Sequence, residues 1–141
     1  CGNDETNMFI TACIGVLNLK TGILKYVNAG HNHPLLFNDN SIDYVDMKTG
    51  VVLGVIEDYQ YKIGELQMKP GDKLLMYTDG VTECKNDKSE FFGDIRFKDF
   101  VNKNNNNEPR VLIQAAYDEL KSFANGAEQS DDITLLCVKY K

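Results

Sequence analysis

The hydrophobic pattern of this 141-residue chain changes its period once, about two thirds of the way along. Up to Tyr77 the apolar residues form short runs separated by turn signals such as Lys20-Thr21-Gly22, which is typical of antiparallel strands joined by hairpins. The spacing then becomes helical, and one last apolar run closes the chain. This order of strands, helices and a final strand predicts an α+β fold. The predicted strands cover residues 8–17, 23–29, 34–37, 42–45, 61–68, 74–77 and 133–140.

Two of these runs carry a finer signal. Residues 8–17 are apolar on both faces, so we expect a central strand that is covered on both sides. In residues 61–68 the alternation slips by one position around Gly64, and a β-bulge there would restore a single buried face.

The last third predicts two helices. The longer one follows from the spacing of Leu112, Ala116, Leu120 and Phe123, with Pro109 in its first turn, a residue of the Asn104–107 run as its cap and Gly126 past its end. Phe97, Phe100 and Val101 indicate a shorter helix before it. Because no repeat and no composition break is visible, residues 1–141 are interpreted as a single domain.

Composition and charge exclude several classes of function. With 43% hydrophobic and 26% charged residues, the chain has the composition of a globular protein. Its net charge of -6 and the lack of a basic cluster argue against nucleic acid or an anionic membrane as partner. The four cysteines show no CxxC spacing, so a zinc site is not expected and a reducing, cytoplasmic setting is the default.

Two short acidic motifs border apolar runs. Thr78-Asp79-Gly80 ends one run, and Asp131-Asp132 opens another. If the two runs are antiparallel neighbours, Asp79 leaves one strand where Asp131 enters the other, and both carboxylates could reach one cation. Carboxylates without His or Cys partners favour a hard metal such as Mg²⁺ or Mn²⁺. Asp-Gly is also a common turn dipeptide, so on these residues alone a metal site and a pair of turns both stay open.

Both histidines lie in one stretch, Gly30-His31-Asn32-His33-Pro34. Their spacing would put both side chains on one face of an extended segment, so a metal pair is conceivable. We favour a different role for His31, as a residue beside the site that fixes loop geometry through a side-chain hydrogen bond. His33 is expected to be exposed.

Six motifs together resemble a known family. In chain order they are Phe9-Ile10-Thr11-Ala12, Tyr26-Val27-Asn28-Ala29-Gly30-His31-Asn32-His33-Pro34-Leu35-Leu36, Pro70-Gly71-Asp72, Tyr77-Thr78-Asp79-Gly80-Val81-Thr82-Glu83, Phe92-Gly93 and Ser130-Asp131-Asp132-Ile133-Thr134. The same order is found in bacterial PPM-type serine/threonine phosphatases that resemble stage II sporulation protein E, the type 2C-like enzymes that regulate sigma factors and other signalling switches. The resemblance runs from about Met8 to Tyr140.

The resemblance implies an antiparallel β-sandwich flanked by helices, with a Mn²⁺ or Mg²⁺ pair at one end. The metals would activate a water that attacks phosphorus directly, without a phosphoenzyme. By the family pattern Asp79 and Asp131 would be metal ligands, and no catalytic residue beyond the ligands is implied. Asp132 would act behind the ligands, and Gly80 would let the backbone turn away from the metal without a clashing side chain.

The family's site also needs an aspartate from an early Gly-Asp motif, and the residues here contain none before the Phe9-Ile10-Thr11-Ala12 strand. We therefore interpret the chain as the C-terminal part of the phosphatase domain, truncated at its N-terminus. Alone it is expected to bind metal weakly, to be nearly inactive and to self-associate through an exposed sheet face.

The favoured function is hydrolysis of phosphoserine or phosphothreonine on a regulatory protein, such as an anti-sigma-factor antagonist. The alternative is a non-catalytic, phosphatase-like binding or regulatory module. A third hypothesis is a different metal hydrolase that uses a similar carboxylate pair. No direct membrane contact is expected, because no apolar stretch approaches the roughly 20 residues that span a bilayer.

Overall fold

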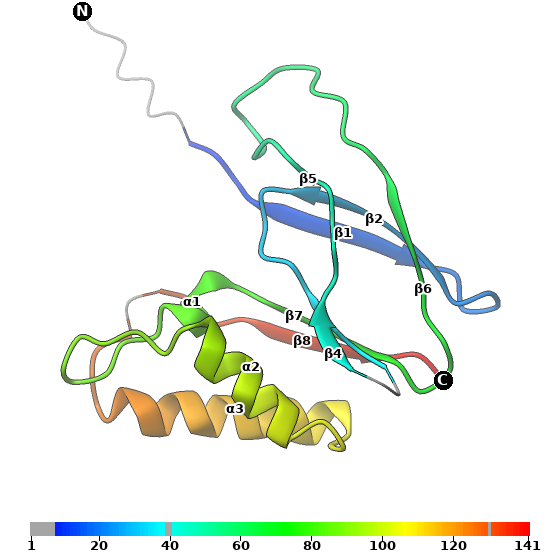
Figure 1. The fold of residues 1–141 in the computed structure, drawn as a ribbon. Helices are drawn as coiled ribbons and strands as arrows, with labels where there is room; N and C mark the ends of the chain where they lie inside the picture. Colours follow the sequence, from blue (N-terminus) through cyan, green and yellow to red (C-terminus); the bar gives the residue numbers. More distant parts are fainter. Residues whose placement is uncertain (1–7, 39–40, 130) are drawn as a thin grey trace, which may run out of the picture. The chain divides into compact units, whose positions relative to one another are not determined.

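The computed structural model describes residues 8–38, 41–129 and 131–141, and it confirms the α+β class (Figure 1). Its elements are, in chain order, β1 (Ala12–Leu17), β2 (Ile23–Ala29), β3 (Leu35–Phe37), β4 (Ile42–Tyr44), β5 (Thr49–Gly50), β6 (Gly64–Gln67), β7 (Lys73–Tyr77), α1 (Asp79–Thr82), α2 (Asp94–Lys103), α3 (Pro109–Ala124) and β8 (Leu135–Lys139).

The chain forms two compact units, each with its own sheet. One unit comprises Cys1–His31 and Asp46–Met68, and the other comprises Asn32–Val45 and Lys69–Lys141. The first sheet has the order β1-β2-β5, with β6 also paired to β2, and the second has the order β4-β3-β7-β8.

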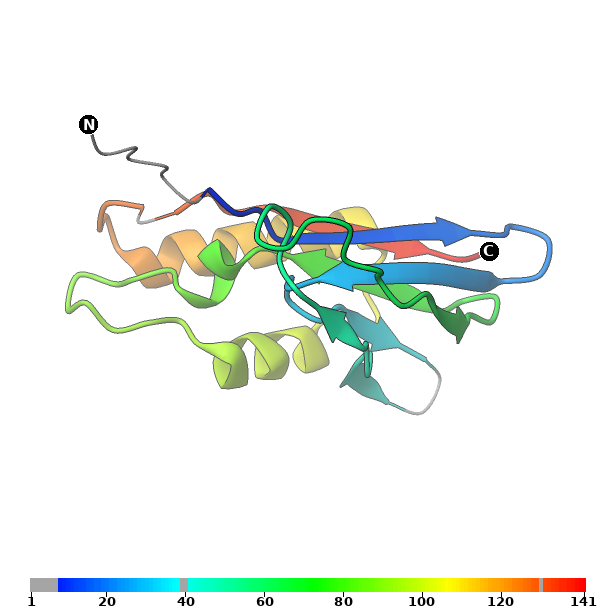
Figure 2. The ribbon, with the colours of Figure 1, turned by 90° about the horizontal axis from the view of Figure 1, so that it is seen from above.

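In the first unit, β1 and β2 form the predicted antiparallel hairpin (Figure 2). Their register runs from Ala12 opposite Ala29 to Leu17 opposite Leu24. The other partners of β2 are β5, in parallel, and β6, antiparallel. Because β2 lies inside this sheet, it supplies the buried Leu24, Tyr26 and Ala29.

The prediction of a central, covered first strand is wrong for the residues that the structure describes. There β1 pairs with β2 alone and so lies at the sheet edge. One of its faces is open to solvent: Ile14 is 64% and Val16 is 72% exposed. An apolar pattern on both faces therefore did not mean burial on both faces.

The predicted bulge at Gly64 is also absent. Strand β6 begins at Gly64, and Ile63, outside the strand, is 70% exposed. Gly64 instead makes room for Tyr26, the residue it pairs with, because a Cβ on Gly64 would lie 2.3 Å from Cζ of that ring. The Tyr26 ring covers Gly64. The alternation of apolar residues shifts at this position because the strand begins here, and not because the strand contains a bulge.

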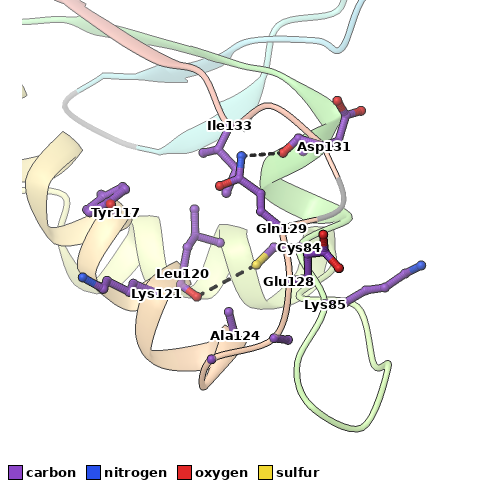
Figure 3. Close-up of a pocket in the computed structure, with 13 residues that line it drawn as sticks. Cys84, Lys85, Tyr117, Leu120, Lys121, Ala124, Glu128, Gln129, Asp131 and Ile133 are labelled. Atoms are coloured by element: carbon purple, nitrogen blue, oxygen red, sulfur yellow. Dashed lines mark hydrogen bonds between the residues drawn. The ribbon is translucent and has the colours of Figure 1, made fainter.

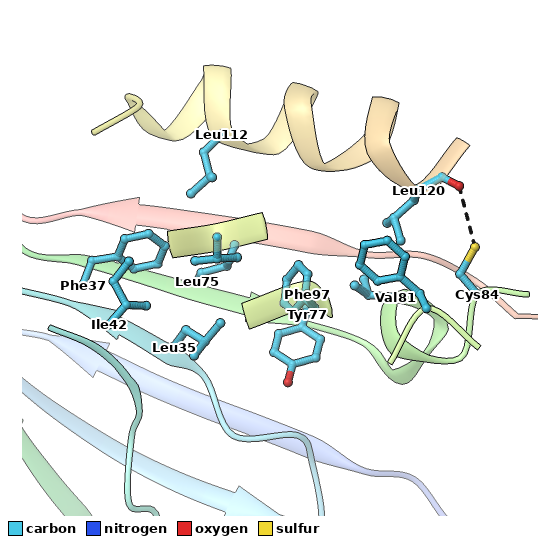
Figure 4. Packing of buried hydrophobic residues seen from close by; sticks show 12 residues of the cluster. Leu35, Phe37, Ile42, Leu75, Tyr77, Val81, Cys84, Phe97, Leu112 and Leu120 are labelled. Atoms are coloured by element: carbon cyan, nitrogen blue, oxygen red, sulfur yellow. Dashed lines mark hydrogen bonds between the residues drawn. The ribbon is translucent and has the colours of Figure 1, made fainter. Parts of the chain in front are cut away.

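In the second unit every strand pair is antiparallel, and β7 lies between β3 and β8, as expected for a run that is apolar throughout. Helix α3 carries Leu112 and Leu120 toward the sheet, which contributes Leu75 and Tyr77 (Figure 4). The rings of Tyr77 and Phe97 of α2 lie 4.8 Å apart, centroid to centroid. The buried cluster consists of Leu35, Phe37, Ile42, Leu75, Tyr77, Val81, Cys84, Phe92, Phe97, Val101, Leu112 and Leu120.

The ends of α3 follow the sequence only in part. Pro109 occupies the first turn as predicted, and the left-handed Asn125 (φ 49°) ends the helix just before Gly126. The cap, however, is Glu108 and not an asparagine. In the described part of the chain, no helix has both the length and the apolar character needed to cross a bilayer.

The asparagine run is held by a buried lysine. Lys73, only 7% exposed, donates hydrogen bonds from Nζ to the carbonyl oxygens of Asn105 and Asn107, the latter at 2.8 Å. Its ammonium group also lies 4.8 Å from the centre of the Phe37 ring. The loop between α2 and α3 is thereby tied to the start of β7.

Candidate functional site

The pairing of β7 with β8 brings the two acidic motifs to the same sheet end. Tyr77, the last residue of β7, pairs with Leu135, the first residue of β8. The chain leaves β7 through Thr78 into α1, which begins at Asp79, and it reaches β8 through residues 131–134. The antiparallel arrangement that the sequence analysis required is therefore present, although Ser130 of the second motif lies outside the described residues.

Gly80 is the point at which the two segments touch. A Cβ on this residue would lie 2.5 Å from the carbonyl oxygen of Asp132 and 3.3 Å from that of Asp131. Gly80 is buried within α1, and its φ is not in the left-handed region. Glycine is thus required here for close approach of two backbones and not for an unusual backbone conformation.

The carboxylates are accessible. Asp79, Asp131 and Asp132 are all exposed. Each of the two expected ligands is oriented by a local backbone donor: Oδ1 of Asp79 accepts from the Gly80 N–H at 3.1 Å, and Oδ1 of Asp131 accepts from the Asp132 N–H at 2.7 Å.

This donor set fits one side of a hard-cation site. Two carboxylates on touching segments are the oxygen ligands that Mg²⁺ and Mn²⁺ prefer. Among the residues described, however, no group of three or more His, Cys, Asp or Glu side chains is placed to hold a metal ion. The described residues thus offer part of a ligand set.

His31 belongs to the first unit, and both its side chain and its backbone are hydrogen-bonded there. Its Nδ1 is hydrogen-bonded to Oγ1 of Thr11 at 3.0 Å. The Asn28 side chain, which is 1% exposed, accepts from the His31 N–H at 2.7 Å and donates to the His31 carbonyl at 2.9 Å. His33 is half-buried, so the expectation that it is exposed was wrong.

Behind the acidic segments lies a cavity of about 310 Å³ that the sequence analysis did not find (Figure 3). Gly80 and Asp131 belong to its wall, together with Leu120 and Tyr117 of α3 and Ile133. Cys84 also lines it and donates weakly to the Leu120 carbonyl oxygen at 3.9 Å. Burial raises the pKa of the Cys84 thiol, which disfavours the nucleophilic thiolate. No local motif marks this cavity, because its wall comes from three separate segments.

The family model described as "Stage II sporulation protein E (SpoIIE)" matches residues 1–141. The chain belongs to the SpoIIE family. The PPM-type resemblance found in the motifs is therefore confirmed.

Named relatives agree with the SpoIIE assignment. Protein IcfG of Synechocystis sp. (strain ATCC 27184 / PCC 6803 / Kazusa) is 34% identical over 131 residues, which are 93% of this chain and 20% of that protein. Phosphoserine phosphatase RsbU of Bacillus subtilis (strain 168) is 26% identical over 140 residues, or 99% of this chain and 41% of RsbU. The chain thus spans less than half the length of these relatives.

A solved structure supports the fold. The phosphatase domain of the cell fate determinant SpoIIE from Bacillus subtilis, from a Mn-presoaked preparation, matches with a TM-score of 0.69 and 19% identity. The match covers 99% of this chain and 59% of that domain's chain. At this identity the likeness establishes a shared fold.

Proposed function

We propose that the protein carrying this chain is a metal-dependent protein serine/threonine phosphatase, with the chain forming the C-terminal part of its PPM-type domain. The observation that carries the proposal is the meeting of the Asp79 and Asp131 segments at Gly80 in a chain that matches the SpoIIE family over its whole length. Carboxylates at a sheet end are suited to hold divalent cations, and phosphate ester hydrolysis is a reaction that such cations assist.

In this proposal Asp79 and Asp131 hold the cations, either Mn²⁺ or Mg²⁺. When bound, the cations supply Lewis acidity toward water and neutralise charge on the phosphoryl oxygens. Asp132 acts behind the ligands, Gly80 allows the two backbones to meet, and His31 supports the neighbouring loop. The oxygen of water forms a new bond to phosphorus and gives up one proton, the bond from phosphorus to the serine or threonine oxygen breaks, and the departing oxygen takes up one proton.

The proposed substrate is a phosphorylated regulatory protein, such as an anti-sigma-factor antagonist in the cytoplasm. Two observations support this substrate class. The relative RsbU is a phosphoserine phosphatase, and all three carboxylates are exposed, so a protein-borne phosphoryl group could reach them. The net charge of -6 disfavours a nucleic acid substrate.

One observation favours a second candidate, a non-catalytic phosphatase-like module. The part of the chain that the structure covers contains no cluster of three or more potential metal-binding side chains. A Gly-Asp motif upstream of Cys1 in the coding sequence would provide the additional aspartate and favour the enzyme.

The test measures phosphate release from a phosphoserine protein substrate by the full natural protein, with and without Mn²⁺. We expect activity that depends on Mn²⁺ and falls at least about 100-fold in Asp79→Asn and in Asp131→Asn, since removal of a key transition-state interaction costs roughly that much. Asp118→Asn, which changes an exposed carboxylate of α3, is the matched control. Equal rates in all four proteins would exclude this site as the seat of hydrolysis.

A further inference from the structure

Thr78 lies between the buried strand β7 and Asp79, and its side chain does not cap the helix that follows it. It is the N-cap residue of α1 (φ -88°, ψ 160°), yet it forms no side-chain capping bond to that helix. A threonine at an N-cap normally accepts from the first turn of its own helix. Here the hydroxyl is used elsewhere.

The hydroxyl instead connects the two acidic segments. Oγ1 of Thr78 donates to the carbonyl oxygen of Asp132 at 2.9 Å and accepts from the N–H of Thr134 at 3.0 Å. The backbone N–H of Thr78 donates to the carbonyl oxygen of Thr134 at 3.1 Å. These three bonds, which we call the Thr78 clamp, lie next to Asp79 on one side and Asp131 on the other.

The clamp needs a group that donates and accepts at the same time. A hydroxyl does both, whereas an aliphatic side chain of the same shape does neither. The bonds lie immediately beyond the last β7–β8 pair, Tyr77 with Leu135, and continue the connection where ladder pairing ends. At that same place Gly80 permits the backbone contact with Asp132.

We propose that Thr78 is a positioning residue that fixes the Asp79 and Asp131 carboxylates relative to each other for cation binding. This inference rests on the proposed metal-dependent function, but it concerns residues that bind no cation themselves. Hydrogen-bonded residues behind metal ligands typically change metal affinity by about 10- to 100-fold when they are replaced.

The experiment compares Thr78→Val, Thr78→Ser and Thr134→Val in the full natural protein. Mn²⁺ affinity is measured by calorimetry, and the Mn²⁺ dependence of phosphate release is followed in parallel. Thr134→Val is the matched control, because Thr134 enters the clamp through its backbone and the substitution keeps those atoms.

We expect Thr78→Val to weaken Mn²⁺ binding by about 10- to 100-fold. Its hydrolysis should need more Mn²⁺ but reach a maximal rate close to that of the unaltered protein. Thr78→Ser should restore most of the affinity, and Thr134→Val should bind as the unaltered protein does. Unchanged affinity in Thr78→Val, a serine variant as weak as the valine variant, or an equal loss in Thr134→Val would each overturn the proposal.

A second measurement needs no variant and no metal. If the clamp holds, the Thr134 amide hydrogen exchanges with solvent as slowly as the amides of β8, and exchange at the rate of an unprotected amide would refute it. Mn²⁺ binding without any hydrolysis would contradict the phosphatase proposal. The Thr78 clamp would still be tested separately, by the Mn²⁺ affinity of the variants and the exchange rate of the Thr134 amide.

Discussion

Gly80 and Asp132 are in backbone contact: the carbonyl oxygen of Asp132 lies 2.5 Å from the position that a Cβ on residue 80 would occupy. Two segments more than 50 positions apart in the chain thus meet without a side chain between them. The next two nearest atoms are also backbone atoms, the carbonyl carbon of Asp132 and the carbonyl oxygen of Asp131. None of them can move as a flexible side chain would.

We therefore expect Gly80→Ala to lower the free energy of unfolding by about 1–3 kcal/mol, the usual cost of an added group in a packed place. Denaturant unfolding measures the loss. Gly15→Ala is the control, because the atom nearest its added Cβ, at 2.9 Å, is Cδ1 of the Leu24 side chain, which can rotate away. A loss at Gly80 no larger than at Gly15 would show that the 131–132 backbone yields easily.

The 141-residue chain itself should bind Mn²⁺ weakly through its two carboxylates. A calorimetric titration of the chain beside its Asp79→Asn, Asp131→Asn double variant checks this. We expect weak binding that disappears in the double variant, because two ligands supply only part of the coordination that the cation prefers. A double variant of exposed acids in α2 and α3, Asp99→Asn, Asp118→Asn, should titrate like the unaltered chain. Identical titrations of all three proteins would mean that the carboxylates do not share a cation.

The stability of the second unit should fall at alkaline pH because of Tyr77. Burial raises the pKa of its phenol, and the side chain is 5% exposed. Above the ordinary tyrosine pKa of about 10 the unfolded state loses this proton while the folded state keeps it. The unfolded state then binds fewer protons, so stability declines as pH rises.

The loss from this one group amounts to at most about 1.4 kcal/mol per pH unit. Tyr77→Phe should therefore flatten the decline in unfolding free energy measured between neutral pH and pH values above roughly 10. Tyr117→Phe, which removes a hydroxyl from a 51% exposed ring, is the control. A slope that is the same in both variants would assign the alkaline sensitivity to other groups.

The open face of β1 should make the isolated chain self-associate. Ile14 and Val16 expose apolar surface on a strand whose described neighbour is β2 alone, and such edges pair readily with other chains. Light scattering across concentrations is expected to show dimers or larger species, and Val16→Lys should shift them toward monomer. Val111→Lys, on the surface of α3, should leave the association unchanged. A clean monomer at every concentration would contradict this prediction.

Local periodicity was enough to predict most elements. The β1–β2 hairpin, the inner position of β7 and the span of α3 follow from apolar spacing and turn residues, which act over a few positions. These features depend on patterns that a sequence displays directly. The antiparallel pairing of β7 with β8 entered the sequence analysis only as a condition, and the structure meets it, which brings the Asp79 and Asp131 segments together.

What could not be predicted depends on which surfaces are covered. Strand β1 has the composition of a buried strand, but Ile14 and Val16 are exposed, since apolar content does not determine what packs on each face. Gly64 was interpreted through backbone conformation, and Gly80 as a residue whose missing side chain avoids a clash at the metal. In the structure each makes room for a distant partner, the Tyr26 ring or the Asp132 carbonyl. Contacts of this kind arise from tertiary packing and produce no repeating pattern in the sequence.

The hydrogen bonds from Lys73 to the loop between α2 and α3 affect how that loop can vary during evolution. Lys73 binds the main-chain oxygens of Asn105 and Asn107, which every residue type carries. The side chains of Asn105 and Asn106 are exposed, so drift to other polar residues at these two positions should be nearly neutral. An insertion or deletion would instead move the carbonyl groups away from the ammonium, so selection should conserve the length of this loop more strictly than its composition.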